Sequence, residues 1–521
     1  MRMSASLNPG LPLGQEDVET VTILNSDTVN SQFTNHSSYH HYPTAREYEP
    51  AGLTFLMMTS AITWIMLPGV GFFYSGMARS KSALSLLMLC LWSAAIVSIQ
   101  WYLIGFTLCL SNTGGKLIGN LDHLLMREIG DRPSFTHDQV PLLLASVWYS
   151  LFAAITPTVF LGAIAERARF FPTVIFIFLW STFVFDFLCY WTWNKNGWSF
   201  LLGSLDFGGG TPVHLSSGAA ALAFSYMVGK REDTSEKPPQ NMSNVYLGTS
   251  FIWCGWLVAN AGSGLYPHIR AVNVFVTTNL AASMGGITWG IIDYIRHGQK
   301  WSPLGFCAGV ICGLVCITPA SGYVTPSSSL FFGFAGAICC NFAMSSKKLL
   351  HVDDAFDVFS CHGVGAIVGN LLTGVFAQRK VAAVDGQHIQ GGWLDGHWAQ
   401  IGYQAVDTAA GFAWSFFVTL LILFFINKFP GLHLRASPED QEVGLDKVEL
   451  GVGLYEHLND LKPEIVSAIG TKTIHPNVIA ISTIAENGHG PQHIIKNGHN
   501  GFIVDSGGGK EMADVETSDH I

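Results

Sequence analysis

The stretch DFGGGTPVHLSSG, residues 206–218, has a counterpart in DAFDVFSCHGVG, residues 354–365. In each stretch an Asp stands eight residues before a His, and small residues follow that His. Each stretch begins one of about eleven apolar segments of roughly membrane-spanning length, and the two segments are five crossings apart. Because five is odd, the two helices are expected to run in opposite directions, as in the inverted-topology repeats of transporters. The pair predicts an all-α polytopic membrane protein with two inverted five-helix repeats and one extra helix.

The apolar segments fill the body of the chain and are separated by polar loops. They lie near residues 52–74, 84–110, 141–164, 171–192, 212–228, 245–261, 272–293, 303–318, 328–343, 356–376 and 404–427. Only 12% of the 521 residues are charged, against roughly 25% in soluble proteins, which excludes an ordinary water-facing surface. Nucleic-acid binding is not expected, because 27 Lys and Arg stand against 37 Asp and Glu. We therefore expect eleven transmembrane helices.

Basic residues fix the expected orientation. The loops after the odd-numbered segments, including the last, carry thirteen Lys and Arg, and the alternate loops carry seven. By the positive-inside rule, the N-terminus is outside and the C-terminus is cytosolic. The net charge of −10 combines −4 in residues 1–50 and −8 in residues 429–521 with +2 in residues 51–428, so the negative excess lies in the two ends.

These observations divide the chain into three parts. Residues 1–50 are expected to form an extracellular N-terminal tail, and residues 51–428 the eleven-helix body. Residues 429–521 are expected to form a cytosolic, regulatory C-terminal tail. Its distal part lacks apolar runs, so we expect it to be disordered.

His214 and His362 are the two histidines that stand well inside the expected spans. Eight residues of helix rise ~12 Å, and half of the hydrocarbon thickness is ~15 Å, so both side chains reach the midplane from opposite sides. Asp206 then lies at the extracellular mouth and Asp354 at the cytosolic mouth, each as a helix N-cap. Neutral imidazoles donate and accept hydrogen bonds, so the pair can pass a proton or hold a small polar molecule. Transmembrane histidines also occur as haem ligands in membrane redox proteins, which is a competing class.

Several motifs together resemble the Amt/Mep/Rh ammonium transporters, and most of all their fungal members. They are residues 206–218 and 353–365, PGVGFFYSG at 68–76, FAAITP at 152–157, AIAERAR at 163–169 and CYWTWNKNGW at 189–198. The resemblance covers roughly residues 51–450. It implies a plasma-membrane, multi-pass transporter for ammonium and methylammonium, with one pathway in each subunit of a homotrimer. It implies no enzymatic activity, no catalytic residue, no cofactor and no metal.

The resemblance also assigns roles to single residues. The family's twin pore histidines fall on His214 and His362. Its external recruitment site falls on Trp193 and Ser263, with Asp206 as the capping aspartate beside them. One gate phenylalanine falls on Phe152, and Asp354 and Asp357 belong to the cytosolic mouth.

Two positions depart from the family pattern. The second gate phenylalanine is replaced by Ala259, which would leave the gate half open unless another aromatic side chain substitutes. Asp186 stands inside an expected span without a family counterpart, although a buried carboxylate is costly and normally faces a cavity or a partner. Its role is left open.

The sequence thus favours ammonium uptake in which ammonium loses its proton near the gate, ammonia passes along the histidines, and the proton is relayed separately. The expected partners are ammonium or ammonia, methylammonium, membrane lipid and further copies of the chain. Cytosolic regulators or kinases that act on the C-terminal tail are candidate partners. The alternative is a transporter-like ammonium sensor that signals through this tail with weak or no transport.

Overall fold

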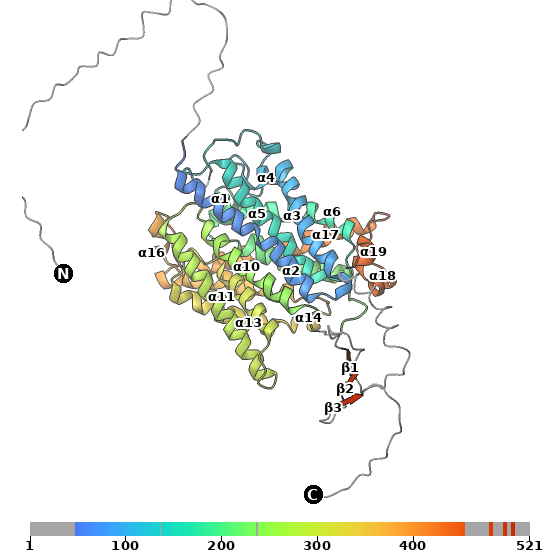
Figure 1. The fold of residues 1–521 in the computed structure, drawn as a ribbon. Helices are drawn as coiled ribbons and strands as arrows, with labels where there is room; N and C mark the ends of the chain where they lie inside the picture. Colours follow the sequence, from blue (N-terminus) through green and yellow to red (C-terminus); the bar gives the residue numbers. More distant parts are fainter. Residues whose placement is uncertain are drawn as a thin grey trace, which may run out of the picture. The chain divides into compact units, whose positions relative to one another are not determined.

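The computed structural model describes residues 47–135, 137–235 and 238–453, and the backbone of three short strands between residues 479 and 505. Helices dominate the three long ranges (Figure 1). Each apolar segment expected from the sequence coincides with helix to within a few residues. The expectations for the N-terminal tail fall on residues 1–46, which lie outside the described residues.

Several spans in the first half of the body change helix type along their length. The α-helices are α1 (Pro50–Trp64), α2 (Met66–Met77), α3 (Ala83–Gln100), α4 (Phe106–Leu110), α5 (Leu142–Leu161), α6 (Phe170–Trp180), α7 (Asp186–Trp193), α8 (Trp198–Leu202) and α9 (Ser216–Val228). The π-helices are η3 (Trp101–Gly105), η6 (Ser181–Phe185) and η7 (Gly210–Leu215). The 3₁₀ turns are η2 (Ser80–Ser82), η4 (Leu124–Met126) and η5 (Gly162–Ile164).

The second half is more regular, with one π-helix. The α-helices are α10 (Met242–Gly262), α11 (Ile269–Arg296), α12 (Pro303–Ile317), α13 (Pro326–Ala343), α14 (Ser346–Leu349), α15 (Gly365–Phe376), α16 (Arg379–Ala382) and α17 (Gln400–Lys428). The π-helix is η8 (Phe359–Val364), and the 3₁₀ turns are η9 (Ala383–Asp385) and η10 (Trp393–Asp395). Proline begins α12 and α13, where its fixed φ suits the first helical turn. Ser302 caps α12 by accepting the Gly305 N–H at 2.9 Å.

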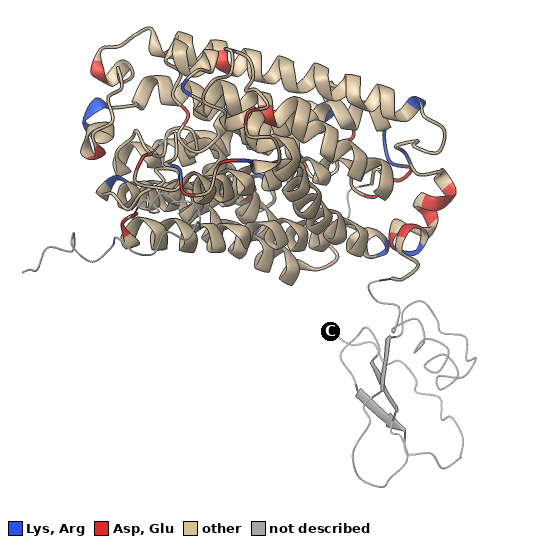
Figure 2. Ribbon diagram, turned by 90° about the horizontal axis from the view of Figure 1, so that it is seen from above, with Lys and Arg blue, Asp and Glu red and all other residues tan. Residues whose placement is uncertain are grey.

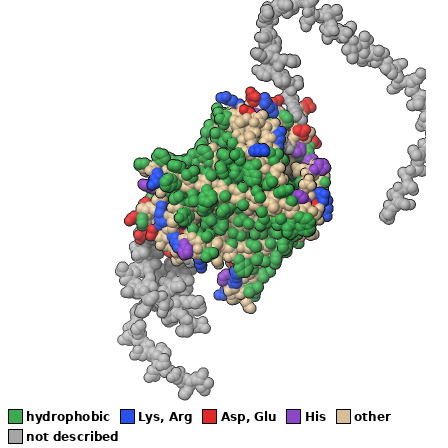
Figure 3. Space-filling model, turned by 180° about the vertical axis from the view of Figure 1, so that it is seen from behind, with side chains coloured by type: hydrophobic (Ala, Val, Ile, Leu, Met, Phe, Trp, Pro, Cys, Tyr) green, Lys and Arg blue, Asp and Glu red, His purple; other side chains and the backbone are tan. Residues whose placement is uncertain are grey.

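Seven helical rods in the described part of the chain are long and apolar enough to cross a membrane. They are Pro50–Met77, Ser80–Leu110, Leu142–Ile164, Phe170–Leu202, Pro326–Leu349, Phe359–Phe376 and Gln400–Lys428. Their outward side chains are apolar: Phe417 on α17, for example, is 66% exposed. Hydrophobic side chains cover most of the face seen in Figure 3, and Figure 2 shows the charged residues gathered near the helix ends. This distribution suits a protein whose sides face lipid.

The helices that carry the two histidines lie antiparallel. Thr211, at the start of one, bonds to Asn370, near the end of the other, whereas Gly218 meets Gly363 further along. A Cβ atom at Gly218 would lie 2.2 Å from the Gly363 backbone nitrogen, so only glycine permits this crossing. The opposite directions expected for these two helices are confirmed.

The first part of the C-terminal tail packs against the helical body. It forms α18 (Pro438–Val443) and α19 (Leu445–Leu450), and Ser437 caps α18 in a capping box with Asp440. The Asp446 carboxylate accepts the N–H groups of Leu84 and Ser85 at the start of α3, at 3.0 and 2.7 Å. The tail is therefore held at the helix N-terminus where a negative charge is stabilised.

The distal tail, for which we expected disorder, contains three short strands outside the helical body. Three strands, β1 (Ile479–Ser482), β2 (His493–Lys496) and β3 (Phe502–Asp505), pair antiparallel in the order β1-β2-β3. These four-residue runs contain Ile and Val, which favour strands, and they are too short to register in a search for membrane-length segments. The remaining residues after 453, for which we expected disorder, lie outside the described residues.

Candidate functional site

The two histidines meet inside the helical body. His214 in η7 and His362 in η8 are both buried, and their Nδ1 atoms lie 3.4 Å apart. The His214 ring also stacks on Trp256, with ring centroids 4.7 Å apart. One imidazole must donate and the other accept, so the pair can pass a proton from ring to ring. The structure brings the two side chains together, and their expected depth at the midplane stays a prediction.

Aspartates organise the start of both histidine helices. The Asp206 carboxylate accepts the N–H groups of Gly209, Gly210 and Thr211 at 2.7–2.8 Å. Asp354 accepts the Phe359 N–H at 2.7 Å, directly before η8. Both carboxylates bond to N–H groups at a helix start, which have no partner within the helix, but the N-cap positions themselves fall on Gly209 and Val358 and not on the two aspartates.

A cavity of about 110 Å³ surrounds the histidine pair, and we call it the histidine cavity. Apart from His214 and His362, its wall is mainly hydrophobic and includes Phe152, Trp256 and Ala259. An ion without a partner is strongly disfavoured in such surroundings, whereas a small neutral molecule is tolerated. The cavity therefore suits a small neutral molecule better than a bare ion.

A second cavity, of about 570 Å³, is lined by Trp193, Ser263 and Asp206, and we call it the recruitment cavity. Trp193 donates its Nε1–H to the Asp206 carbonyl at 3.2 Å, which fixes the indole. The Ser263 hydroxyl donates to the Ala259 carbonyl at 3.0 Å, so its oxygen lone pairs can accept a bond from a cation. The three residues assigned to cation recruitment thus share one cavity.

The contact of Phe152 with Trp193 lies between these two cavities. Phe152 lines the histidine cavity, Trp193 lines the recruitment cavity, and their rings meet edge to face with centroids 5.6 Å apart. No residue lines both cavities in the part of the chain that the structure describes. Ala259 is buried in the wall of the histidine cavity and provides no ring, and the rings that pack on Phe152 are those of Trp193 and Trp148.

A third cavity, of about 830 Å³, adjoins the histidine cavity at its opposite end. Met77, Phe356 and Asp357 line both, so the two cavities are direct neighbours. Asp357 is held by an ion pair with Lys347 at 2.9 Å. We call this space the basic cavity, because six basic side chains line it: Arg79, Lys81, Lys230, Arg231, Lys347 and Lys348.

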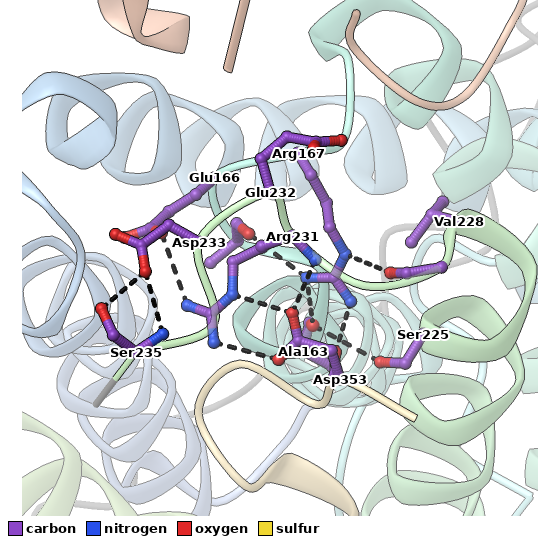
Figure 4. A network of polar contacts seen from close by, with 12 residues as sticks. Ala163, Glu166, Arg167, Ser225, Val228, Arg231, Glu232, Asp233, Ser235 and Asp353 are labelled. Atoms are coloured by element: carbon purple, nitrogen blue, oxygen red, sulfur yellow. Dashed lines mark hydrogen bonds and ion pairs between the residues drawn. The ribbon is translucent and has the colours of Figure 1, made fainter. Parts of the chain in front are cut away.

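Ion pairs stabilise the loops around the basic cavity (Figure 4). Arg231 pairs with Asp353 at 2.9 Å and with Glu166 at 3.4 Å, and Glu166 also binds Arg79. Burial alone would raise the pKa of Asp353, but its bonds to Arg231 and the charges of Arg167 and Arg231 outweigh burial and lower it. Arg167 donates to backbone carbonyls, among them that of Asp353, and so ties these loops together.

Comparison with known proteins agrees with this geometry. A model described as the Ammonium Transporter Family matches residues 54–455. The chain belongs to this family. The resemblance to the Amt/Mep/Rh transporters, and to their fungal members in particular, is confirmed.

This family member is similar to transporters from two yeasts. It is 45% identical to Ammonium transporter 1 of Schizosaccharomyces pombe, over 86% of this chain and 91% of that protein. It is 40% identical to Ammonium transporter MEP2 of Saccharomyces cerevisiae, over 80% of this chain and 86% of that protein.

Two solved structures are similar to this Ammonium Transporter Family member in fold and in sequence. The crystal structure of Candida albicans Mep2 matches with a TM-score of 0.73 and 41% identity, over 80% of this chain and 92% of that chain. A structure titled Sensor Amt Protein matches with a TM-score of 0.69 and 28% identity, over 77% of this chain and 98% of that chain.

Asp186, whose role the sequence left open, lies away from the cavities of this transporter family member. Its carboxylate is fully buried and accepts a bond from the Gln100 amide at 2.8 Å, with the Cys109 thiol at 3.4 Å. It is not among the residues that line the three cavities. Asp186 thus joins α7 to the end of α3 and to α4.

Sequence reasoning overlooked Asp407 in α17, which is another buried carboxylate of this family member. It is 2% exposed and contacts Thr211, three residues before His214. A signal was present: Gln400, Gln404 and Asp407 recur at helical spacing at the start of the last apolar segment. The apolar run that follows them masked this polar stripe.

Proposed function

We propose that this chain takes up ammonium and methylammonium across the plasma membrane, through a pathway that passes ammonia and relays the proton separately. The single observation that carries the proposal is the contact of two imidazoles, 3.4 Å apart, inside an apolar cavity. Membership of the Ammonium Transporter Family supports the substrate. The two yeast relatives are named ammonium transporters, which supports transport as the activity.

Selection begins in the recruitment cavity. Potassium and ammonium carry the same charge and have similar size, so selectivity must use hydrogen bonds and proton loss. The Trp193 ring can hold a cation for ~1–2 kcal/mol, and the Ser263 oxygen can accept an N–H bond. Potassium can use the ring but has no N–H to donate.

Proton loss follows at the Phe152 barrier. Beyond Phe152 the apolar wall disfavours a bare cation, so ammonium deprotonates there and ammonia continues alone. The proton passes through His214 and His362, and transport is electrogenic. Ammonia leaves through the basic cavity and is protonated again in water.

The proposed arrangement in the membrane has eleven spans, with the N-terminus outside and residues 429–521 in the cytosol. The basic cavity carries six Lys and Arg side chains and the recruitment cavity one, Lys195, which favours a cytosolic basic cavity. A homotrimer with one pathway per subunit, surrounded by lipid, completes this proposal. Cytosolic regulators or kinases would act on the tail.

Uptake of radiolabelled methylammonium in a transporter-deficient cell tests the function. We expect uptake together with an inward current that saturates with ammonium. In His214→Ala the current should vanish while ammonia flux persists, because the relay loses one imidazole. An unchanged current in this variant would refute the proton path.

An ammonium sensor with weak transport is the second candidate, and the match to the structure titled Sensor Amt Protein is the observation that favours it. Abundant protein at the cell surface without methylammonium uptake would favour the sensor. Uptake that follows the surface amount of protein would exclude a pure sensor.

A further inference from the structure

Asp407 is a buried carboxylate that the proposed pathway does not use. Its Oδ2 accepts the hydroxyl hydrogen of Thr211 at 2.5 Å, and its Oδ1 accepts that of Ser199. No ion pair to Asp407 occurs within the described ranges 47–135, 137–235 and 238–453. A carboxylate in such a place is costly, so its two hydroxyl bonds must satisfy it.

Thr211 connects this carboxylate to both histidine helices. Its hydroxyl oxygen accepts a bond from the Asn370 amide at 2.9 Å. Thr211 lies three residues before His214, and Asn370 lies eight residues after His362. A single hydroxyl therefore bridges the helix of His214 and the helix of His362.

The carboxylate fixes the direction of these bonds. A carboxylate can only accept, so Thr211 must point its single hydrogen at Asp407 and its lone pairs at Asn370. The Asn370 amide also donates to Thr408 at 3.0 Å, and its two hydrogens are then both used. An amide in place of Asp407 could donate to Thr211, which would turn the hydroxyl and release Asn370.

The same face of α17 contacts the rest of the His214 segment. Gln404, one turn before Asp407, exchanges two bonds with the Leu205 backbone, at 2.7 and 2.8 Å. Ser415, two turns after Asp407, donates to the Ser216 carbonyl at 2.7 Å. The last helix of the body thus supports this segment from the residue before Asp206 to the residues after His214.

We propose that Asp407 is a positioning residue that, through Thr211 and Asn370, fixes the His214 helix against the His362 helix and sets the separation of the paired imidazoles. This inference rests on the proposed function, because the separation matters only if a proton crosses between the rings. Asp407 itself is not among the residues that line the histidine cavity.

The test compares wild type with Asp407→Asn, Thr211→Val and Thr211→Ser in transporter-deficient cells. Ammonium-induced current and radiolabelled methylammonium uptake are measured on the same cells and normalised to surface protein. We expect current to fall roughly 10- to 100-fold in Asp407→Asn and Thr211→Val, since small displacements of reacting groups have effects of this size. Uptake should fall less, because neutral ammonia needs no contact between the rings. Thr211→Ser keeps the hydroxyl and should keep the wild-type ratio of charge to substrate, which is the ammonium-induced current divided by the methylammonium uptake.

Asp186→Asn is the matched control, since Asp186 is also a buried carboxylate but bonds away from the cavities. Its ratio of charge to substrate should equal that of wild type even if less protein reaches the surface. If Asp407→Asn and Thr211→Val lose current and uptake in equal proportion, Asp407 supports only the fold and the inference is wrong. Wild-type behaviour of both variants would also overturn it. A wild type with neither uptake nor current would instead refute the proposed function, and the positioning role with it.

Discussion

Phe152 and Trp193 meet edge to face with ring centroids 5.6 Å apart, and this contact lies between the recruitment cavity and the histidine cavity. Trp148 supports Phe152 from a second side, at 5.5 Å. Edge-to-face pairs add ~0.5–1.5 kcal/mol beyond the area that they bury, so both contacts help to hold the Phe152 ring in this position.

Removing the Phe152 ring should abolish selectivity against potassium while ammonium transport continues. In Phe152→Ala the two cavities would join, water would enter, and the penalty on a bare cation would fall. We expect potassium-dependent current that wild type lacks, measured in the absence of ammonium. Phe152→Leu, which keeps an apolar side chain, should show less potassium current. A Phe152→Ala protein that reaches the surface and still excludes potassium would contradict this role.

Ala259 allows the opposite test, in which a ring is added to the wall of the histidine cavity instead of removed. A phenylalanine there would place a ring in a wall of a cavity of only about 110 Å³. Overpacking of this kind costs about 1–3 kcal/mol, and the ring would also narrow the path beside Phe152. We expect Ala259→Phe to fold, to transport methylammonium several-fold more slowly, and to exclude potassium as well as wild type does.

The comparison for this variant is the initial rate of methylammonium uptake per surface molecule. Ala259→Val adds less volume and should lie between wild type and Ala259→Phe. An uptake rate that is unchanged in Ala259→Phe would mean that this part of the wall does not limit passage.

The sequence was sufficient to predict the histidine pair. The matching Asp-to-His spacing, together with an odd number of segments between the copies, placed His214 and His362 together before any contact was known. Local patterns carry this information because the spacing of residues along a helix is fixed. The segment boundaries followed for the same reason.

Contacts between distant segments could not be predicted in this way. The Phe152–Trp193 barrier and the Thr211–Asp407 bond join residues 41 and 196 positions apart. Asp446 bonds to Ser85 across 361 positions. No periodicity encodes such pairs, because they arise only when whole helices pack. The resemblance to a family supplied the Phe152 role but had no counterpart for Asp186.

The crossing at Gly218 predicts a sharp effect of one methyl group. In Gly218→Ala the new Cβ atom would lie 2.2 Å from the Gly363 nitrogen, so the two histidine helices must move apart. We expect loss of current together with lower thermal stability of the purified protein. Gly402→Ala in α17 is the matched control, because a Cβ atom there meets nothing within 4 Å. Wild-type current in Gly218→Ala would show that the helix crossing tolerates separation.

The Asp353–Arg231 pair at the basic cavity predicts a pH-dependent part of stability. The bonds and charges of Arg231 and Arg167 lower the pKa of Asp353 below the ~3.9 of an unfolded aspartate, despite burial. A carboxylate with a lowered pKa stabilises the fold above about pH 4, and this contribution is lost as the pH falls through its folded-state pKa. We expect Asp353→Asn to be less stable than wild type by ~1–3 kcal/mol at pH 7, because Arg231 then loses a charged partner. Below about pH 4 the difference should shrink, since wild-type Asp353 becomes neutral as well.

Thermal unfolding of the purified protein at several pH values measures this difference. Glu128→Gln serves as the control, because its pair with Arg132 is exposed, with 71% of the Glu128 side chain accessible, and should contribute little at any pH. A gap between wild type and Asp353→Asn that stays constant down to about pH 3 would mean that packing, not the charge of Asp353, supports these loops. A gap that closes on acidification assigns the stabilisation to the ion pair, and thereby to the loops that frame the exit from the histidine cavity.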